Sequence, residues 1–113
     1  MEQIRVSEEA SWRSIYTATV MVMNRTGPVE MVARSKQVGK ALFVAAKLRG
    51  DGLLDEKRTT ISFPTVERMP DGNEVVDVSM VLFPDERRTA EKAAYLNQIS
   101  EREPEELDSG RDE

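Results

Sequence analysis

A run of basic residues in the middle of the chain is the pattern with the clearest chemical meaning. The stretch from Met31 to Gly50 contains no aspartate and no glutamate. Its basic residues are Arg34, Lys36, Lys40, Lys47 and Arg49. Lysine and arginine bind phosphate groups and gain affinity by releasing the counterions of a polyanion. Ser35 lies within the run, and the backbone amides of residues 36–38, at the start of an expected helix, add a small anion site. The run predicts a nucleic-acid-binding face, and the alternative is an ordinary solvated helix face.

Outside this run, one basic and two aromatic residues are candidates for contact with nucleic acid. Arg68 lies beside a predicted hairpin turn and can reach along a groove, although Asp71 and Glu74 next to it oppose a phosphate backbone. Trp12 and Tyr16 have rings that can stack on bases. Their helical spacing is more typical of side chains in a core, so we expect both to be buried.

The composition removes most catalytic chemistry. The chain of 113 residues has no cysteine and no histidine, and therefore no disulfide, thiolate nucleophile, imidazole base or usual transition-metal ligand. Asp51 and Asp55 flank Gly52, with Glu56 next to them, but they lack the ligand number of a calcium-binding loop. A domain of this size builds one modest core without a deep substrate cavity. We expect a protein that is not an enzyme and has no catalytic residue, cofactor or metal.

The charge of the chain is unevenly distributed. The net charge is -5, and residues 101–113 carry all of it, so that residues 1–100 are neutral. We expect residues 101–113 to be a disordered acidic tail. No apolar stretch approaches the roughly 18 residues that a membrane span needs, and the N-terminus lacks the pattern of a signal peptide. We expect a cytoplasmic protein that does not bind membranes.

The first half of the chain predicts two strands, each followed by a helix. Alternation over Gln3–Ser7 and the apolar run Val29–Ala33 are typical of strands. Ser11 is a good N-cap for the first helix. The second helix begins at Lys36 and ends at Gly50, where we expect a left-handed C-cap.

The second half predicts a hairpin and a last helix. The strand Thr59–Val66 contains Pro64, which confines it to a sheet edge or a bulge. The turn at residues 70–73 joins it to the strand Val76–Leu82. Asp85 can cap a helix after this strand.

The order of these elements predicts an α+β domain with two layers. Residues 1–86 give the order β-α-β-α-β-β, which we expect to form a four-stranded mixed sheet with the helices on one face. Residues 87–100 form an appended helix in this scheme, and the acidic tail follows.

Four segments together resemble a known family. They are Met1–Ser7, Pro28–Met31, Gly39–Ala45 and Asp71–Glu74. These segments resemble the stage V sporulation protein S family, a small bacterial family of the Alba-like superfamily. The resemblance spans roughly residues 1–86. It implies an Alba-like fold, a dimer, binding of DNA or RNA and a role in developmental regulation. In that family a small, glycine-rich turn usually precedes the second helix, and here Arg34–Lys36 adds positive charge to that turn.

Residues and resemblance together predict a non-catalytic protein that binds DNA or RNA mainly through phosphates. The expected contacts are Arg34, Ser35, Lys36, Lys40, Lys47, Arg49 and Arg68. We also expect a homodimer with Phe43 as a contact, because so small a two-layer domain leaves surface uncovered. The alternative is a protein–protein interaction or regulatory module that acts through the C-terminal helix and the acidic tail, which can mimic nucleic-acid charge or shield the basic face.

Overall fold

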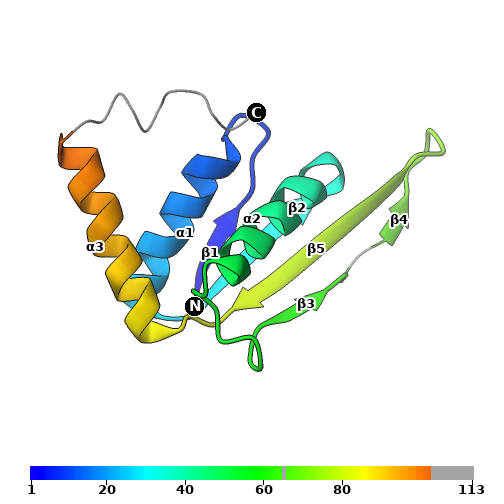
Figure 1. Ribbon diagram of the computed structural model, residues 1–113. Coiled ribbons are helices and arrows are strands. Elements are labelled where there is room, and N and C mark those ends of the chain that lie inside the picture. The colour runs from blue at the N-terminus through cyan, green and yellow to red at the C-terminus, as the bar shows by residue number, and fades with distance from the viewer. Residues whose placement is uncertain (65, 103–113) are drawn as a thin grey trace.

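The predicted order of elements is confirmed by a computed structural model, which describes residues 1–64 and 66–102 (Figure 1). The elements are β1 (Glu2–Arg5), α1 (Trp12–Thr26), β2 (Val29–Arg34), a 3-10 turn η1 (Ser35–Gln37), α2 (Val38–Gly50), β3 (Thr60–Ser62), β4 (Val66–Arg68), β5 (Glu74–Leu82) and α3 (Glu86–Arg102). The α+β class, the mixed sheet and the C-terminal helix are therefore as the sequence predicts.

The sheet has five strands in place of the expected four, because the third predicted strand is divided. The order is β1-β2-β5-β3, and β4 also pairs with β5. The pair β1–β2 is parallel, whereas β5 runs antiparallel to β2, β3 and β4. Pro64 lies in the gap between β3 and β4. Proline has no backbone N–H for the hydrogen-bond ladder, so the edge strand is interrupted there.

The core lies between the sheet and the helices. Both α1 and α2 pack on one face of the sheet, and α3 packs on α1 (Figure 1). Alternate residues of the central strands β2 and β5 are buried on that face: Val29, Met31, Ala33, Val78, Met80 and Leu82. The helices contribute fully buried residues such as Val20 and Leu48. This alternation follows from the period of two along a strand.

Two predicted caps are present at the helix starts. The Ser11 hydroxyl accepts a hydrogen bond of 3.1 Å from the backbone N–H of Ser14 at the start of α1. The Asp85 carboxylate accepts one of 3.1 Å from the backbone N–H of Arg88 at the start of α3. Both side chains satisfy amides that have no partner within their helices.

The expected left-handed cap at Gly50 is wrong. Gly50 is the last residue of α2, Asp51 is its cap, and the glycine with positive φ is Gly52, at 78°. The Leu53 backbone N–H then bonds to the Leu48 carbonyl at 3.0 Å, and the Leu53 side chain is buried. The chain turns two residues later than expected because this path buries Leu53 and places Asp51 beside Tyr16, 2.5 Å from its hydroxyl.

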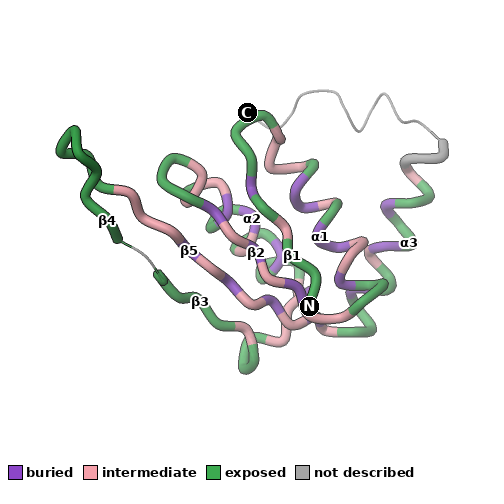
Figure 2. Tube along the Cα trace, turned by 180° about the vertical axis from the view of Figure 1, so that it is seen from behind, coloured by how far each residue is buried: buried purple, intermediate pink, exposed green. Residues whose placement is uncertain are grey.

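One end of the hairpin extends beyond the helices. We call this part the arm: β4, the turn at residues 69–73, and residues 74–76 of β5. Figure 2 shows that its tip and β4 are exposed. The molecule measures 50 × 32 × 21 Å along its principal axes. The arm therefore presents its side chains to solvent or to a partner.

Candidate nucleic-acid interface

Six of the seven predicted contact residues separate into two groups at opposite ends of α2, and the seventh, Lys40, lies within the helix. Arg34, Ser35 and Lys36 lie where β2 leads into α2, and Arg68 lies on the arm at the same end of the sheet (Figure 1). We call these four residues the hairpin end. In register, Arg34 is opposite Asp77 of β5 and Arg68 is opposite Glu74, about 10 Å further along that strand.

The other group lies at the C-terminal end of α2. Lys47 and Arg49 are in its last turn. At 1.5 Å per helical residue, they are separated from Lys36 by about 16 Å or more. The basic run thus contributes to two surfaces of the molecule.

Arg34 is held by an acidic partner across the sheet. Its Nε donates to Asp77 Oδ1 at 2.7 Å, and its Nη2 donates to Asp77 Oδ2 at 3.2 Å. The hydrogen bonds and the charge of Asp77 raise the pKa of Arg34. A two-pronged pair of this kind fixes the guanidinium in place and compensates its charge.

The turn after Arg34 has a strained backbone and a free cation. Ser35 has φ of 53°, a left-handed value that no other described residue except glycine adopts. Such a conformation costs a non-glycine residue about 1 kcal/mol or more, which explains why a small, glycine-rich turn suits this position. Lys36 is exposed and makes no ion pair with the described residues. Lys36 is therefore the uncompensated charge of the hairpin end.

Lys40 is engaged with the loop that follows β1. Its Nζ donates to the backbone carbonyls of Ser7, Glu8 and Ala10 at 2.8, 3.2 and 2.6 Å. An ammonium group has three donors, and these three carbonyls use all of them. In this arrangement Lys40 orders the loop, and a phosphate contact would have to displace one of its carbonyl partners.

Lys47 lies over an aromatic ring, whereas Arg49 pairs with an acidic side chain. The Lys47 Nζ lies 5.8 Å from the centroid of the Trp12 ring, which is a cation–π distance. The Arg49 Nε forms an exposed ion pair of 3.1 Å with Glu56. On the arm, Arg68 forms a comparable exposed pair of 3.4 Å with Glu74.

The expected burial of the two aromatic residues of α1 is confirmed for Tyr16 and only in part for Trp12. Tyr16 is 6% exposed, and its hydroxyl donates to Asp51. Burial, and then the hydrogen bond and charge of Asp51, raise the pKa of Tyr16 far above its usual value. Trp12 is only partly buried, and its ring meets the edge of Phe43 with centroids 5.1 Å apart. Tyr16 is thus a core residue, whereas Trp12 lies at the margin of the core.

A third set of basic and aromatic residues on α3 was not predicted. Arg88, Lys92 and Tyr95 follow one another at steps of four and three, so they share one face of the helix. The Lys92 Nζ lies 5.8 Å from the Tyr16 ring centroid and 5.4 Å from that of Tyr95. The spacing alone reveals this face, but nothing local shows that it lies beside Tyr16.

The sheet face away from the helices is polar and has its own partners. Glu30 accepts hydrogen bonds from the Ser79 hydroxyl at 2.7 Å and the Gln3 amide at 3.1 Å. These bonds lower the pKa of Glu30. By the alternation of side chains along β2 and β5, the Arg34–Asp77 pair of the hairpin end lies on this face, so acids and cations are mixed there.

Residues 1–64 and 66–102 contain no group of three or more acidic side chains arranged to hold a metal ion. Within the same ranges, no helix is long and apolar enough to cross a membrane.

Comparison with solved structures defines the fold class as Alba-like. The chain is similar to ALBA1 from Trypanosoma brucei, with a TM-score of 0.67 and 16% identity over 96% of this chain and 92% of that chain. It is also similar to Alba from Thermoplasma volcanium, with a TM-score of 0.52 and 20% identity over 73% of this chain and 99% of that chain. No protein-family model and no curated protein matches the sequence. These likenesses show the fold.

Proposed function

We propose that the protein binds DNA or RNA without catalysis, and that the hairpin end supplies its phosphate contacts. The observation that carries the proposal is the arm, which projects Arg68 past the helix layer at the end of the sheet where Arg34–Lys36 lie (Figure 1). The Alba-like fold supports the proposal. The sequence resemblance points to the same superfamily, and that resemblance implies binding of nucleic acid. A projecting pair of strands with a basic turn at its base can follow a groove.

The acidic partners at the hairpin end do not prevent phosphate binding. The side chains of Arg34 and Arg68 are 62% and 72% exposed, although each pairs with an acid. The pair of Arg68 with Glu74 is exposed on both sides, and such pairs contribute about 0–1 kcal/mol, so a phosphate can replace Glu74 at small cost. Arg34 is held more firmly by two hydrogen bonds to Asp77. Lys36 needs no such exchange. We expect moderate affinity, strong salt dependence and little sequence preference.

The test is a binding titration against salt with labelled DNA and RNA. The double variant Lys36→Glu/Arg68→Glu should weaken binding about tenfold or more at low salt and reduce the slope of log affinity against log salt by about 2. The control Arg25→Glu/Lys57→Glu makes the same change of charge at exposed positions away from the hairpin end. Equal affinities and slopes for the two double variants would contradict the proposed site.

We also propose that a second copy of the chain covers an apolar surface beside the arm. Large apolar side chains are exposed there and on α2: Leu42, Phe43, Ile61, Phe63, Val66 and Met69. Ile61 is opposite buried Met80, and Val66 is opposite Val76, so both face the helix side of the sheet. No helix within residues 1–64 and 66–102 covers them. A symmetric dimer hides such a surface on both copies at once.

The dimer is tested by light scattering over the micromolar range. Ile61→Glu should raise the dimer dissociation constant more than about tenfold, because it places a charge in an apolar contact. Thr60→Glu is the matched control, since its side chain points to the opposite face of the same strand. A wild-type protein that remains monomeric throughout the range contradicts the proposal.

The relation to the stage V sporulation protein S family, and with it a developmental role, is the finer part of this proposal. Its support is the four resembling segments. The alternative function assigns the activity to the C-terminal helix and the tail. In α3, Ala93 and Leu96 are already buried within the chain, and residues 103–113 lie outside the described residues. A chain that ends at Arg102 should still bind nucleic acid under our proposal, and loss of binding would favour the alternative.

A further inference from the structure

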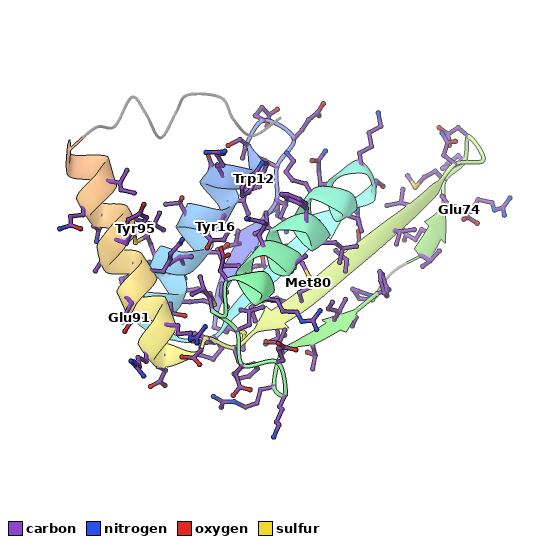
Figure 3. All side chains as sticks on the ribbon, in the orientation of Figure 1. Trp12, Tyr16, Glu74, Met80, Glu91 and Tyr95 are labelled. Atoms are coloured by element: carbon purple, nitrogen blue, oxygen red, sulfur yellow. The ribbon has the colours of Figure 1, made fainter. Side chains whose placement is uncertain are left out.

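Basic and aromatic side chains form a continuous series of contacts across the three helices. Tyr95 and Lys92 of α3 lead to Tyr16 of α1, with Lys92 over both tyrosine rings at 5.4 and 5.8 Å. Tyr16 meets Trp12 edge to face at 6.3 Å, and Lys47 of α2 lies 5.8 Å from the Trp12 ring. Figure 3 shows Trp12, Tyr16 and Tyr95 in this sequence across the helices.

A groove of about 500 Å³ opens at the α3 end of this series. One wall is the turn after α2, with Asp51 and Leu53, and the other is formed by Arg88, Lys92 and Tyr95 of α3. The turn lies against the Arg88 side chain of α3, where residue 52 has no Cβ. A Cβ there would overlap the Arg88 guanidinium. The groove is therefore a feature built by contacts between α2, α3 and the turn.

Two of the three cations that line the groove have no acidic partner among the described residues. Glu91 is paired with Arg87 at 3.4 Å, and Asp51 accepts the hydrogen bond from Tyr16. Among the described residues, the side chains of Arg88 and Lys92 make no ion pair. Lys92 is also half-buried between two rings, so part of its hydration is lost. An anion in the groove would supply the missing charge.

Exposed aromatic surface lies beside this anion site. Tyr95 is 54% exposed, and its ring is next to Lys92. A nucleotide offers a flat base and a phosphate together, and aromatic stacking beside cations is how proteins bind single strands. A cavity of this volume suits a ligand of one or two nucleotides, and a base must leave the duplex stack before it can stack on a tyrosine ring. A purely acidic peptide would use the cations and leave the ring unused.

We propose that this groove binds single-stranded nucleic acid, with a base stacked on Tyr95 and a phosphate contacted by Arg88 and Lys92. The inference rests on the proposed function and extends it to a second site with a different substrate form. The hairpin end would contact phosphates of either form, and the groove would accept unpaired nucleotides only.

The test uses a labelled oligouridine of about 12 nucleotides and a duplex of the same length. Tyr95→Ala should weaken binding of the single strand at least about fivefold and leave duplex binding unchanged, because stacking on one ring is worth a factor of that size. Tyr95→Phe keeps the ring and should bind like the wild type. Asn97→Ala is the control on an exposed position of the same helix.

A further measurement tests the phosphate contact in the groove. Arg88→Gln/Lys92→Gln should reduce the slope of log affinity against log salt for oligouridine by about 1 to 2.

Several results would contradict the proposal that the groove binds single strands, without contradicting the proposed phosphate contacts of the hairpin end. In the first, the wild-type protein binds the duplex and does not bind the single strand. In the second, Tyr95→Ala leaves the affinity for the single strand unchanged. In the third, Asn97→Ala lowers that affinity as much as Tyr95→Ala does. Displacement of oligouridine by an equal concentration of oligoglutamate would show that the base adds nothing, and it would overturn the proposal as well. Conversely, single-strand binding that depends on Tyr95 but not on Lys36 and Arg68 would support the groove and reject the hairpin end.

Discussion

The arm and α3 differ in where their apolar side chains go. In α3, Ala93 is 1% exposed and Leu96 is 9% exposed, both within the chain's own core. In the arm, Val66 is 63% exposed. The two elements have comparable apolar content, but one stabilises the folded chain and the other offers surface to partners. Apolar side chains stabilise the fold only when they are buried. Mutations in α3 and in the arm should therefore change the free energy of unfolding by different amounts.

The largest difference in the free energy of unfolding is expected when a leucine of α3 and a valine of the arm are each replaced by alanine. Leu96→Ala removes buried methyl groups and leaves a cavity, which should lower the free energy of unfolding by about 2 to 3 kcal/mol. Val66→Ala should change it by less than about 0.5 kcal/mol. Urea denaturation at a concentration below that of any dimer measures both. Similar losses for the two variants would mean that the arm packs against the body.

A smaller difference is expected between two glycines with positive φ, one in each region. Gly52, with φ of 78°, lies in the turn against α3, and Gly72, with φ of 93°, lies at the tip of the arm. Alanine at either position costs about 1–2 kcal/mol of backbone strain. At Gly52 the new Cβ also displaces Arg88, whereas at Gly72 it meets nothing within 4 Å.

The arm can relieve its strain by local opening, and the turn at Gly52 cannot without releasing α3. Gly52→Ala should therefore lower the unfolding free energy by about 1–2 kcal/mol, and Gly72→Ala by clearly less. Hydrogen exchange distinguishes the cases, because Gly72→Ala should speed exchange in the arm alone. Faster exchange throughout the chain in this variant would mean that the arm is part of the cooperative unit.

Local patterns predicted the elements, and long-range contacts decided what the charged residues do. Ser11 and Asp85 cap their helices because capping depends on residues within one turn. Pro64 divides its strand for an equally local reason. By contrast, the Lys40 ammonium finds its carbonyls in the loop at residues 7–10, some thirty positions earlier in the chain. The helical spacing of Lys40 gives no sign of a contact with that loop. The sequence therefore predicts that the charge of Lys40 is available to a phosphate.

The same limit applies to Arg34 and to the groove. The partner of Arg34 is Asp77, and this pairing depends on the register of β2 against β5, which the sequence pattern does not specify to one residue. The groove depends on the docking of α3 beside the turn after α2. The residues on each side are visible in the sequence, but their meeting follows from tertiary packing.

The smallest effect expected from the comparison concerns single hydroxyl groups. Thr89 of α3 donates a hydrogen bond of 3.1 Å to the Leu53 carbonyl and is 1% exposed, whereas Thr60 of β3, the edge strand next to the arm, is exposed. Thr89→Val keeps the shape and removes the donor. The Leu53 carbonyl retains the Asp85 backbone N–H at 2.8 Å, so it is not left without a partner.

The cost of Thr89→Val should therefore lie near the lower end for a buried hydrogen bond, at about 0.5–1 kcal/mol. Thr60→Val should have no measurable cost, because valine suits an exposed strand position equally well. Denaturation midpoints with unchanged m-values measure both changes. If Thr89→Val proves neutral, the Thr89 hydrogen bond contributes nothing measurable to the contact between α3 and the turn, and apolar packing such as that of Ala93 and Leu96 supplies the stability instead.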